Sequence, residues 1–236
     1  MGKQPNRHFI VKPSASAQGK GIFITNKFTN VSSLKQSSIV SEYIDNPLLL
    51  DGYKFDLRIY VAMTSINPLR LYVYEEGLVR LATVKYSSAI GNLKQNQYTH
   101  LTNYSLNKKN AAFQENLDAD QDDQGSKQSL TAFRRRLKQM GHDDDLLWSQ
   151  IEDIIVKTCV STEHVVNNAT EMFVPYKSSN CFELLGFDIL IDQNLKPWLL
   201  EVNLSPALAC DSPLDQKIKA NCLSDLLSLA GVVKME

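Results

Sequence analysis

The stretch FELLGFDILIDQNLKPWLLEVN, residues 182–203, decides the fold of this chain. Two apolar runs, 183–191 and 196–203, flank the turn sequence Asp192-Gln193-Asn194. Apolar runs separated by so short a turn predict an antiparallel β-hairpin, in which successive side chains point to opposite faces.

Two carboxylates and an amide share one face of this hairpin. If the turn is centred on Gln193-Asn194, Asp188 pairs near Leu199 and lies one diagonal neighbour from Glu201. Asn203 follows two residues after Glu201, so it points the same way. Carboxylates on an apolar sheet are costly unless a cation neutralises them, and these oxygens suit Mg²⁺ bound together with substrate phosphates. We therefore predict a Mg²⁺ site; the alternative is that Asp188 faces solvent on an edge strand.

Charged residues also alternate in KFDLR, residues 54–58, which reads as a strand. Lys54, Asp56 and Arg58 share one face, whereas the intervening apolar residues face a core. This face suits a surface ladder of charges. It suits a phosphate site equally well, with Lys as a point charge and Arg as a two-pronged donor. The spacing favours neither interpretation.

A glycine-containing loop, residues 13–21, lies between the apolar runs 8–12 and 22–25. The Gly-Lys-Ser/Thr sequence and the following helix of a Walker loop are missing. A loop between two strands is either an ordinary hairpin turn or a flap that donates backbone N–H groups to nucleotide phosphates.

The other patterns predict a strand at residues 39–44, an antiparallel meander at 54–86 and a long polar surface loop at 108–128. Three helices are predicted at residues 129–140, 143–172 and 215–230. We expect the meander to turn at Asn67-Pro68 and again at residues 75–77. The basic run 134–136 is interpreted as a solvated helix face, with contact to an acidic partner as the alternative. Strand groups followed by helices indicate an α+β fold.

Composition narrows the class of protein. The 236 residues are 43% hydrophobic, with 25 Lys and Arg against 26 Asp and Glu, so the chain is globular and nearly neutral. A net charge of −1 argues against bulk electrostatic capture of nucleic acid or anionic lipid. No apolar run approaches the roughly 20 residues that cross a bilayer. The 4 dispersed cysteines are typical of reduced thiols in a cytosolic protein.

Six stretches together resemble the tubulin tyrosine ligase-like enzymes, a branch of the ATP-grasp ligases: FIVKPSASAQGKGI, KFDLRIYV, YEEGLVRLAT, HLTNYSLNKK, FELLGFDIL and KPWLLEVNLSPAL. The resemblance implies an ATP-grasp fold of antiparallel sheets and packed helices over residues 1–236. A nucleotide-flap lobe is expected at about residues 8–53, and a lobe for ATP, Mg²⁺ and substrate at about 54–236. We also expect the family's N-terminal lobe to be missing, so that these residues alone ligate poorly.

The resemblance implies a role for individual residues. Expected ATP contacts are Lys12, Gln18, Gly19, Ser41, Glu42, Tyr43, Ile44, Lys54, Asp56, Thr102 and Asn103. Arg58 and Arg80 should hold carboxylate or acyl-phosphate groups, and with Glu201 they are the expected catalytic residues. The incoming amino acid should contact Arg80, Tyr104, Ser105, Lys127 and Lys219. The Mg²⁺ ligands should be Asp188, Glu201 and Asn203. Ser41 is a departure, because many relatives carry Gln beside the adenine.

YSLNKK, NPLLLDGYKFDLR and PLDQKIKA are most similar to the polyglutamylase members. The implied activity is ATP-dependent ligation of L-glutamate to glutamate side chains of tubulin C-terminal tails, microtubules or another acidic protein. The implied protein is a cytoplasmic, cytoskeletal monomer when full length, with the cilium or basal body as further locations and no nucleic-acid or membrane partner. The alternatives are a glycine or tyrosine ligase of the same family, or an incomplete remnant that binds ATP or a partner.

Overall fold

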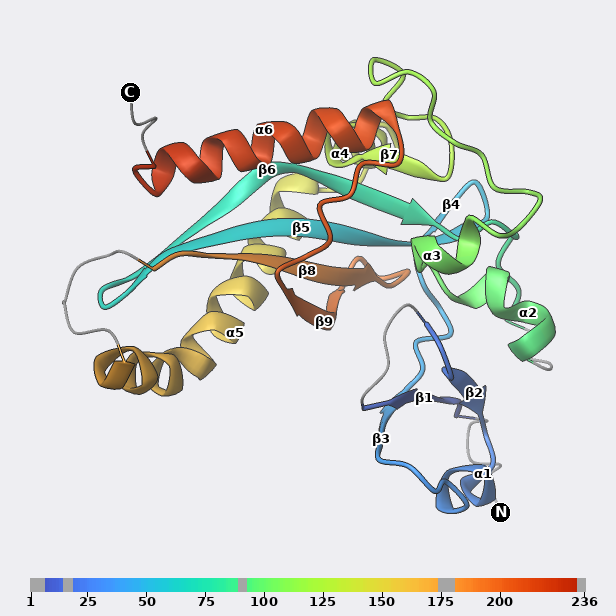
Figure 1. Ribbon diagram of the computed structural model, residues 1–236. Helices are drawn as coiled ribbons and strands as arrows, with labels where there is room; N and C mark the ends of the chain where they lie inside the picture. Colours follow the sequence, from blue (N-terminus) through green and yellow to red (C-terminus); the bar gives the residue numbers. More distant parts are fainter. Residues whose placement is uncertain (1–6, 15–18, 89–92, 174–180, 233–236) are drawn as a thin grey trace. The chain divides into compact units, whose positions relative to one another are not determined.

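The computed structural model describes residues 7–14, 19–88, 93–173 and 181–232 (Figure 1). The chain divides into two compact units. Unit 1 consists of Met1–Phe55, Arg80–Gln114 and Asp192–Asn194, and unit 2 of Asp56–Val79, Glu115–Ile191 and Leu195–Glu236. Antiparallel strands and helices make up the fold, which confirms the predicted α+β class. The expected boundary near residue 53 and the missing lobe stay predictions.

Unit 1 is built on a three-stranded sheet in the order β2-β1-β3. Its elements are β1 (Phe9–Pro13), β2 (Phe23–Thr25), α1 (Phe28–Ser32), β3 (Ser38–Glu42), β4 (Leu49–Leu50), α2 (Leu93–His100) and α3 (Tyr104–Asn107). The strands expected at 8–12, 22–25 and 39–44 are confirmed within two residues. Ile24 and Tyr43 form a small buried cluster against which Ile10 packs. The strands β1 and β2, which flank the glycine-containing loop, pair in antiparallel fashion, so the loop lies between two strands as predicted.

The larger sheet has the order β7-β6-β5-β8-β9, and β4 also pairs with β5. Its strands are β5 (Tyr53–Ile66), β6 (Leu69–Leu81), β7 (Lys127–Ser129), β8 (Glu183–Ile191) and β9 (Pro197–Leu204). Three helices follow the expected patterns within two residues, namely α4 (Leu130–Gln139), α5 (Asp144–Phe173) and α6 (Pro213–Leu229). In unit 2, α6 runs over one side of the sheet and α5 lies on the other (Figure 1).

Helix α6 forms because its start is capped and one of its faces is apolar. The Ser212 hydroxyl accepts a hydrogen bond from the Asp215 N–H, and Pro213 occupies the first turn. Apolar residues at a spacing of four then line one face. They pack against apolar residues of the sheet in one buried cluster of Tyr60, Ala62, Leu78, Leu184, Leu214, Ile218, Cys222 and Leu226.

The turn expected at residues 75–77 is wrong, because β6 continues through them as one strand. Gly77 serves close packing rather than a turn. A Cβ atom at Gly77 would lie 2.5 Å from the backbone oxygen of Arg58 on the neighbouring strand. A glycine inside a strand can mark such a close approach of backbones as well as a turn.

The register of the hairpin also differs from the expected one. Asp188 pairs with Glu201 rather than with Leu199, which lies opposite Ile189. A bulge at this point leaves Leu200 as an extra residue in β9 and shifts the pairing beyond it. The consequence is that the two carboxylates are direct cross-strand neighbours instead of diagonal ones.

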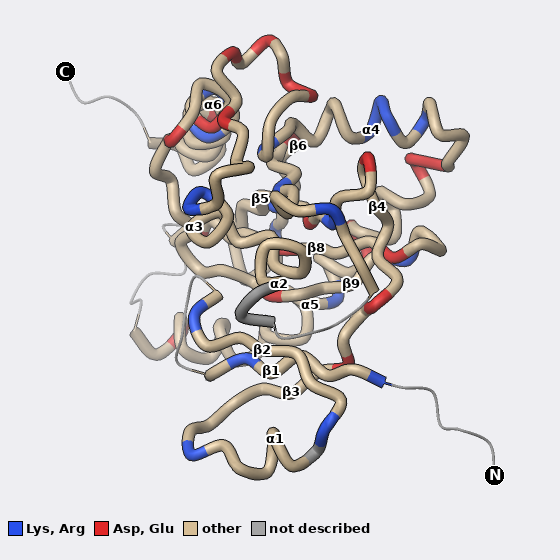
Figure 2. The backbone as a smooth tube through the Cα atoms, turned by 90° about the vertical axis from the view of Figure 1, so that its right-hand side faces the viewer, with Lys and Arg blue, Asp and Glu red and all other residues tan. Residues whose placement is uncertain are grey.

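Acidic residues gather on the loop that leads into β7, whereas α4 carries basic ones (Figure 2). The basic run is not simply solvated, because Arg134 forms an ion pair with Asp144 and Arg135 with Asp122. Among the residues that the structure describes, no helix combines the length and the apolar character that a membrane span requires.

Candidate functional site

Asn107 holds the HLTN segment of unit 1, residues 100–103, in place through hydrogen bonds. Its side-chain oxygen accepts hydrogen bonds from the N–H (3.0 Å) and the hydroxyl (2.9 Å) of Thr83. Its amide nitrogen donates to the carbonyl oxygens of Leu101 (2.8 Å) and Asn103 (3.1 Å). Asn107 is buried, and these four hydrogen bonds use its donors and acceptor capacity fully. The segment predicted to meet ATP is therefore held to the chain just after β6.

Gly19 and Asn103, two of the predicted ATP contacts, lie against each other. A Cβ atom at Gly19 would be 3.0 Å from the Asn103 side-chain oxygen, and the Gly19 backbone has φ +76°. This is the left-handed region, which favours glycine. The close approach and the backbone conformation together explain why glycine stands here. Gln18, the neighbouring predicted contact, lies outside the described residues.

Lys54 belongs to a buried polar network in unit 1. Its Nζ donates a hydrogen bond to the Tyr43 hydroxyl at 3.1 Å and lies 4.6 Å from the centre of the Tyr43 ring. The same hydroxyl lies 2.9 Å from Nδ1 of His100. Tyr86 stacks edge-on against His100, with ring centres 5.5 Å apart. Tyr43 and Lys54 were predicted ATP contacts, whereas His100 and Tyr86 were not predicted to act at all.

The two other members of this network are held in their neutral forms. Burial lowers the pKa of His100 to about 4, and the nearby Lys54 charge acts in the same direction. Burial also raises the pKa of the Tyr43 phenol above its ordinary value. Both groups are therefore neutral at pH 7, and Tyr43 contacts the ammonium without adding a charge of its own.

The other predicted contacts of unit 1 occupy its strands and loops. Lys12 is half-buried on β1, opposite Ile39 of β3. Further along the chain lie the exposed Ser41 and Glu42, the half-buried Ile44, Arg80, Tyr104 and Ser105, and the buried Thr102. Their expected roles in binding ATP or substrate stay predictions.

Arg58 and Asp188 form a two-point ion pair in unit 2. They lie opposite each other on β5 and β8. Arg58 Nε and Nη2 donate to the two oxygens of Asp188 at 2.5 and 3.1 Å. The side chains are 13% and 4% exposed, so the pair is largely desolvated. Gly186 makes room for it, since a Cβ atom there would lie 3.3 Å from Arg58 Cδ.

These contacts decide two alternatives that the sequence left open. Asp188 does not face solvent on an edge strand, because β8 lies between β5 and β9. The KFDLR charges are not a surface ladder either. Lys54 and Asp56 are buried and Arg58 is largely covered, so both faces of β5 are shielded here.

Glu201 and Asn203 complete the predicted Mg²⁺ ligands on β9. Glu201 is exposed and lies directly across from Asp188, and the Asn203 amide donates to a Glu201 oxygen at 3.3 Å. Like charges in directly opposed positions are destabilising unless cations compensate them. Arg58 supplies one positive charge. The remaining carboxylate and amide oxygens are the donors that Mg²⁺ prefers, so the residues present fit the predicted metal.

Lys127 and Lys219, predicted to meet the incoming amino acid, converge on one carboxylate of unit 2. Lys127 on β7 donates a short hydrogen bond to Asp215, and the Lys219 ammonium lies 3.2 Å from the other oxygen of Asp215. Lys219 also donates to the Ala209 carbonyl oxygen at 2.5 Å. Burial lowers the pKa of Lys127, and Asp215 opposes that shift. The structure therefore brings the two predicted lysines together.

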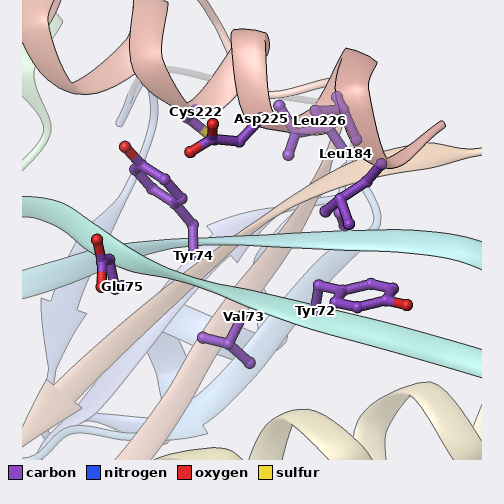
Figure 3. A pocket seen from close by; sticks show the side chains of 10 residues that line it. Tyr72, Val73, Tyr74, Glu75, Leu184, Cys222, Asp225 and Leu226 are labelled. Carbon is purple, nitrogen blue, oxygen red and sulfur yellow. The ribbon is translucent and has the colours of Figure 1, made fainter. Parts of the chain in front are cut away.

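A pocket of about 260 Å³ lies in unit 2 beside α6 (Figure 3). Tyr74, Leu184, Cys222 and Asp225 are among the residues that line it, and no predicted site residue does. Burial, followed by the charges of Cys222 and Asp225, raises the pKa of Tyr74 to about 12. The predicted site residues therefore do not lie in the lining of this pocket.

Sequence reasoning missed His100, Asn107 and Asp215. His100 and Asn107 stand at the two ends of HLTNYSLN, and Asp215 stands four residues before Lys219 on a helix. The pairing of Asp215 with Lys219 could have been predicted, because residues four apart on a helix are neighbours. The contact between Tyr43 and His100 spans 57 residues of chain and had no local signal.

Comparison with known proteins gives a consistent picture. The family model described as "Tubulin-tyrosine ligase family" matches residues 1–236. The human protein named "Tubulin polyglutamylase TTLL5" is 52% identical over 225 residues, which is 95% of this chain and 17% of that protein. "Tubulin polyglutamylase ttll-5" of Caenorhabditis elegans is 48% identical over 95% of this chain and 30% of its own length. Human "Tubulin monoglutamylase TTLL4" is 48% identical over 95% of this chain and 18% of its own length. The chain therefore spans less than a third of these relatives.

Proposed function

The chain belongs to the tubulin-tyrosine ligase family, and we propose that its protein is an ATP-dependent glutamate ligase. The product is an amide between the amine of free L-glutamate and a glutamate side chain of an acidic protein, with tubulin tails as the preferred acceptor. The names of the similar proteins support both the amino acid and tubulin.

One observation carries the chemical part of the proposal. Asp188 and Glu201 are direct cross-strand neighbours with the Asn203 amide beside them, an arrangement of hard oxygen donors. In this role they hold Mg²⁺, which when bound neutralises phosphate charge. Because these donors are part of a sheet, they are held rigidly, as electrostatic catalysis requires.

The reaction runs in two displacements. The acceptor carboxylate attacks the γ-phosphorus of ATP, a P–O bond forms, and the bond to ADP breaks. The amine of glutamate then attacks the acyl carbon, loses a proton and expels phosphate. Lys54 neutralises phosphate charge, while Arg58 and Arg80 hold carboxylate or acyl-phosphate oxygens. No nucleophilic side chain is required, so positioning and charge provide the catalysis.

Lys127 and Lys219 act on the incoming amino acid in this proposal. Their ammonium groups suit the carboxylates of glutamate, whereas glycine and tyrosine carry one carboxylate fewer. The remaining predicted contacts, including Lys12 and Asp56 for ATP and Tyr104 and Ser105 for substrate, keep the roles that the family resemblance implies. We expect the protein to act in the cytoplasm on microtubules, with the cilium or basal body as further places.

Mass spectrometry of tubulin tests the proposal. Tubulin is incubated with the full-length protein, Mg·ATP and one amino acid at a time: glutamate, glycine or tyrosine. We expect tail peptides to gain the mass of glutamate residues, and only when ATP is present. Addition of glycine or tyrosine instead would contradict the proposed substrate, and ATP binding without any addition would identify a non-catalytic remnant.

A further inference from the structure

We infer that Tyr43 and His100 are positioning residues that hold the Lys54 ammonium in place for ATP. The inference deepens the proposed function and rests on the role of Lys54 at ATP in that proposal. It concerns contacts within unit 1, and none of the predicted roles included His100.

The geometry forms a chain of three groups. The Tyr43 hydroxyl accepts a hydrogen bond from Lys54 Nζ at 3.1 Å and lies 2.9 Å from His100 Nδ1. A phenol has one proton and two acceptor positions, so it joins the lysine to the histidine. The Tyr43 ring lies 4.6 Å from the ammonium, which adds an attraction between cation and ring. The ammonium is thus held by the hydroxyl and the ring of one side chain.

His100 in turn fixes Tyr43. The two rings meet edge-on, 5.8 Å apart at an angle of 79°, and Tyr86 contacts the histidine in the same manner. His100 is 1% exposed, and its Nε2 is buried without a hydrogen-bond partner among the described residues. Leaving a buried polar atom unpaired is costly, which a purely apolar ring at this position would avoid. The nitrogen facing Tyr43 therefore accounts for histidine here.

The neutral state of both partners fits this role. A charged histidine would repel Lys54, and burial together with that lysine keeps the pKa of His100 low. A lysine side chain has several rotatable bonds, and ordering it costs conformational entropy on binding. A network that orders the ammonium in advance removes part of that cost from ATP binding.

A double-mutant cycle on the full-length protein tests the inference through Mg·ATP affinity. Tyr43→Phe keeps the ring and removes the hydroxyl, so the Kd for Mg·ATP should rise about tenfold, as for loss of a hydrogen bond to a charged group. In the Lys54→Met background the same change should alter Kd by less than about twofold, because its effect passes through the lysine. The KM for glutamate should not change with Tyr43→Phe.

Variants of His100 provide a second test of the inference. His100→Phe keeps the ring and should weaken ATP binding several-fold, about as much as a lost neutral hydrogen bond. His100→Asn, which places a polar atom near the position of Nδ1, should restore affinity to within about twofold of the parent. Tyr98→Phe, at a half-buried tyrosine two residues before His100, is the matched control and should leave affinity unchanged.

Each outcome is decisive. The inference would be overturned if Tyr43→Phe weakened Mg·ATP binding equally with and without Lys54. It would also be overturned if Tyr43→Phe weakened Mg·ATP binding in neither background. Unchanged ATP affinity in Lys54→Met would instead reject the lysine role in the proposed function, and the inference with it. Thermal melting of every variant separates loss of affinity from loss of fold.

Discussion

Lys54 and Asp188 are both buried charged groups, but their surroundings differ. Lys54 meets the neutral Tyr43 and, through it, the neutral His100. Asp188 meets an opposite charge on Arg58 and a like charge on Glu201. Tyr43 and His100 hold the lysine without adding a negative charge of their own, which suits a site for an anion. At the hairpin two carboxylates from neighbouring strands meet beside the arginine, and their oxygens suit a bound cation.

Removing the exposed carboxylate should have the largest effect. Glu201→Gln should lower the ligation rate by roughly 100-fold or more, since several kcal/mol of charge stabilisation depends on a bound metal. Stability should change little, because Glu201 is exposed. Incorporation of labelled glutamate measures the rate, and Glu152→Gln on the exposed face of α5 is the control. A Gln variant as active as the parent would remove Glu201 from the site.

Breaking the buried ion pair should affect stability in addition to the proposed metal site. Asp188→Asn leaves the Arg58 guanidinium desolvated without its carboxylate, which should cost about 3 kcal/mol in the free energy of unfolding. Urea denaturation measures the loss. The double variant Arg58→Met, Asp188→Leu should recover most of it, because an apolar pair leaves no charge buried. A loss under about 1 kcal/mol for Asp188→Asn would contradict the burial argument.

Acid should act on the lysine network through His100. With a pKa of about 4 in the folded chain against 6.5 in the unfolded one, the unfolded state binds the proton first as the pH falls. The stability linked to His100 is complete above pH 6.5 and is lost towards pH 4, by at most about 3 kcal/mol.

The variant His100→Asn lacks the titrating ring, so its stability is compared with that of the parent. The free energy of unfolding, measured in urea from pH 7 to pH 4, should fall less steeply in the variant. Parallel curves for the two proteins would show that His100 is not held neutral.

Filling the space at Gly186, beside the ion pair, should have the smallest effect. A Cβ atom at Gly186 would lie 2.9 Å from Cβ of Pro206 and 3.3 Å from Cδ of Arg58. Gly186→Ala should therefore cost about 2 kcal/mol of stability through displaced neighbours. Urea denaturation again measures it, and an unchanged midpoint would mean that Pro206 moves away freely.

The two regions also differ in how far the sequence predicts them. The hairpin of residues 183–203 was foreseeable, because alternating runs and a short turn are local signals. Its bulge at Leu200 was not, since an extra residue in one strand leaves the apolar pattern of β9 readable in either register. The correct placement of Asp188 against Glu201 needed the structure.

The lysine network was less predictable still. Tyr43 and His100 meet across 57 residues, and a buried hydrogen bond of that kind has no periodicity to reveal it. The mistaken turn at residues 75–77 has a similar cause. Gly77 is required by the Arg58 backbone of the neighbouring strand, so its meaning depends on a partner that local patterns do not identify.

The central claim is that the protein activates an acceptor carboxylate with ATP. It is tested most directly with a synthetic acidic acceptor peptide whose glutamate side chains carry ¹⁸O. The full-length protein, Mg·ATP and L-glutamate are added, and the released phosphate is analysed by mass spectrometry. The account predicts one ¹⁸O atom in the phosphate for each glutamate joined, because the acyl-phosphate oxygen leaves with phosphorus. Glutamate addition that releases unlabelled phosphate would contradict it.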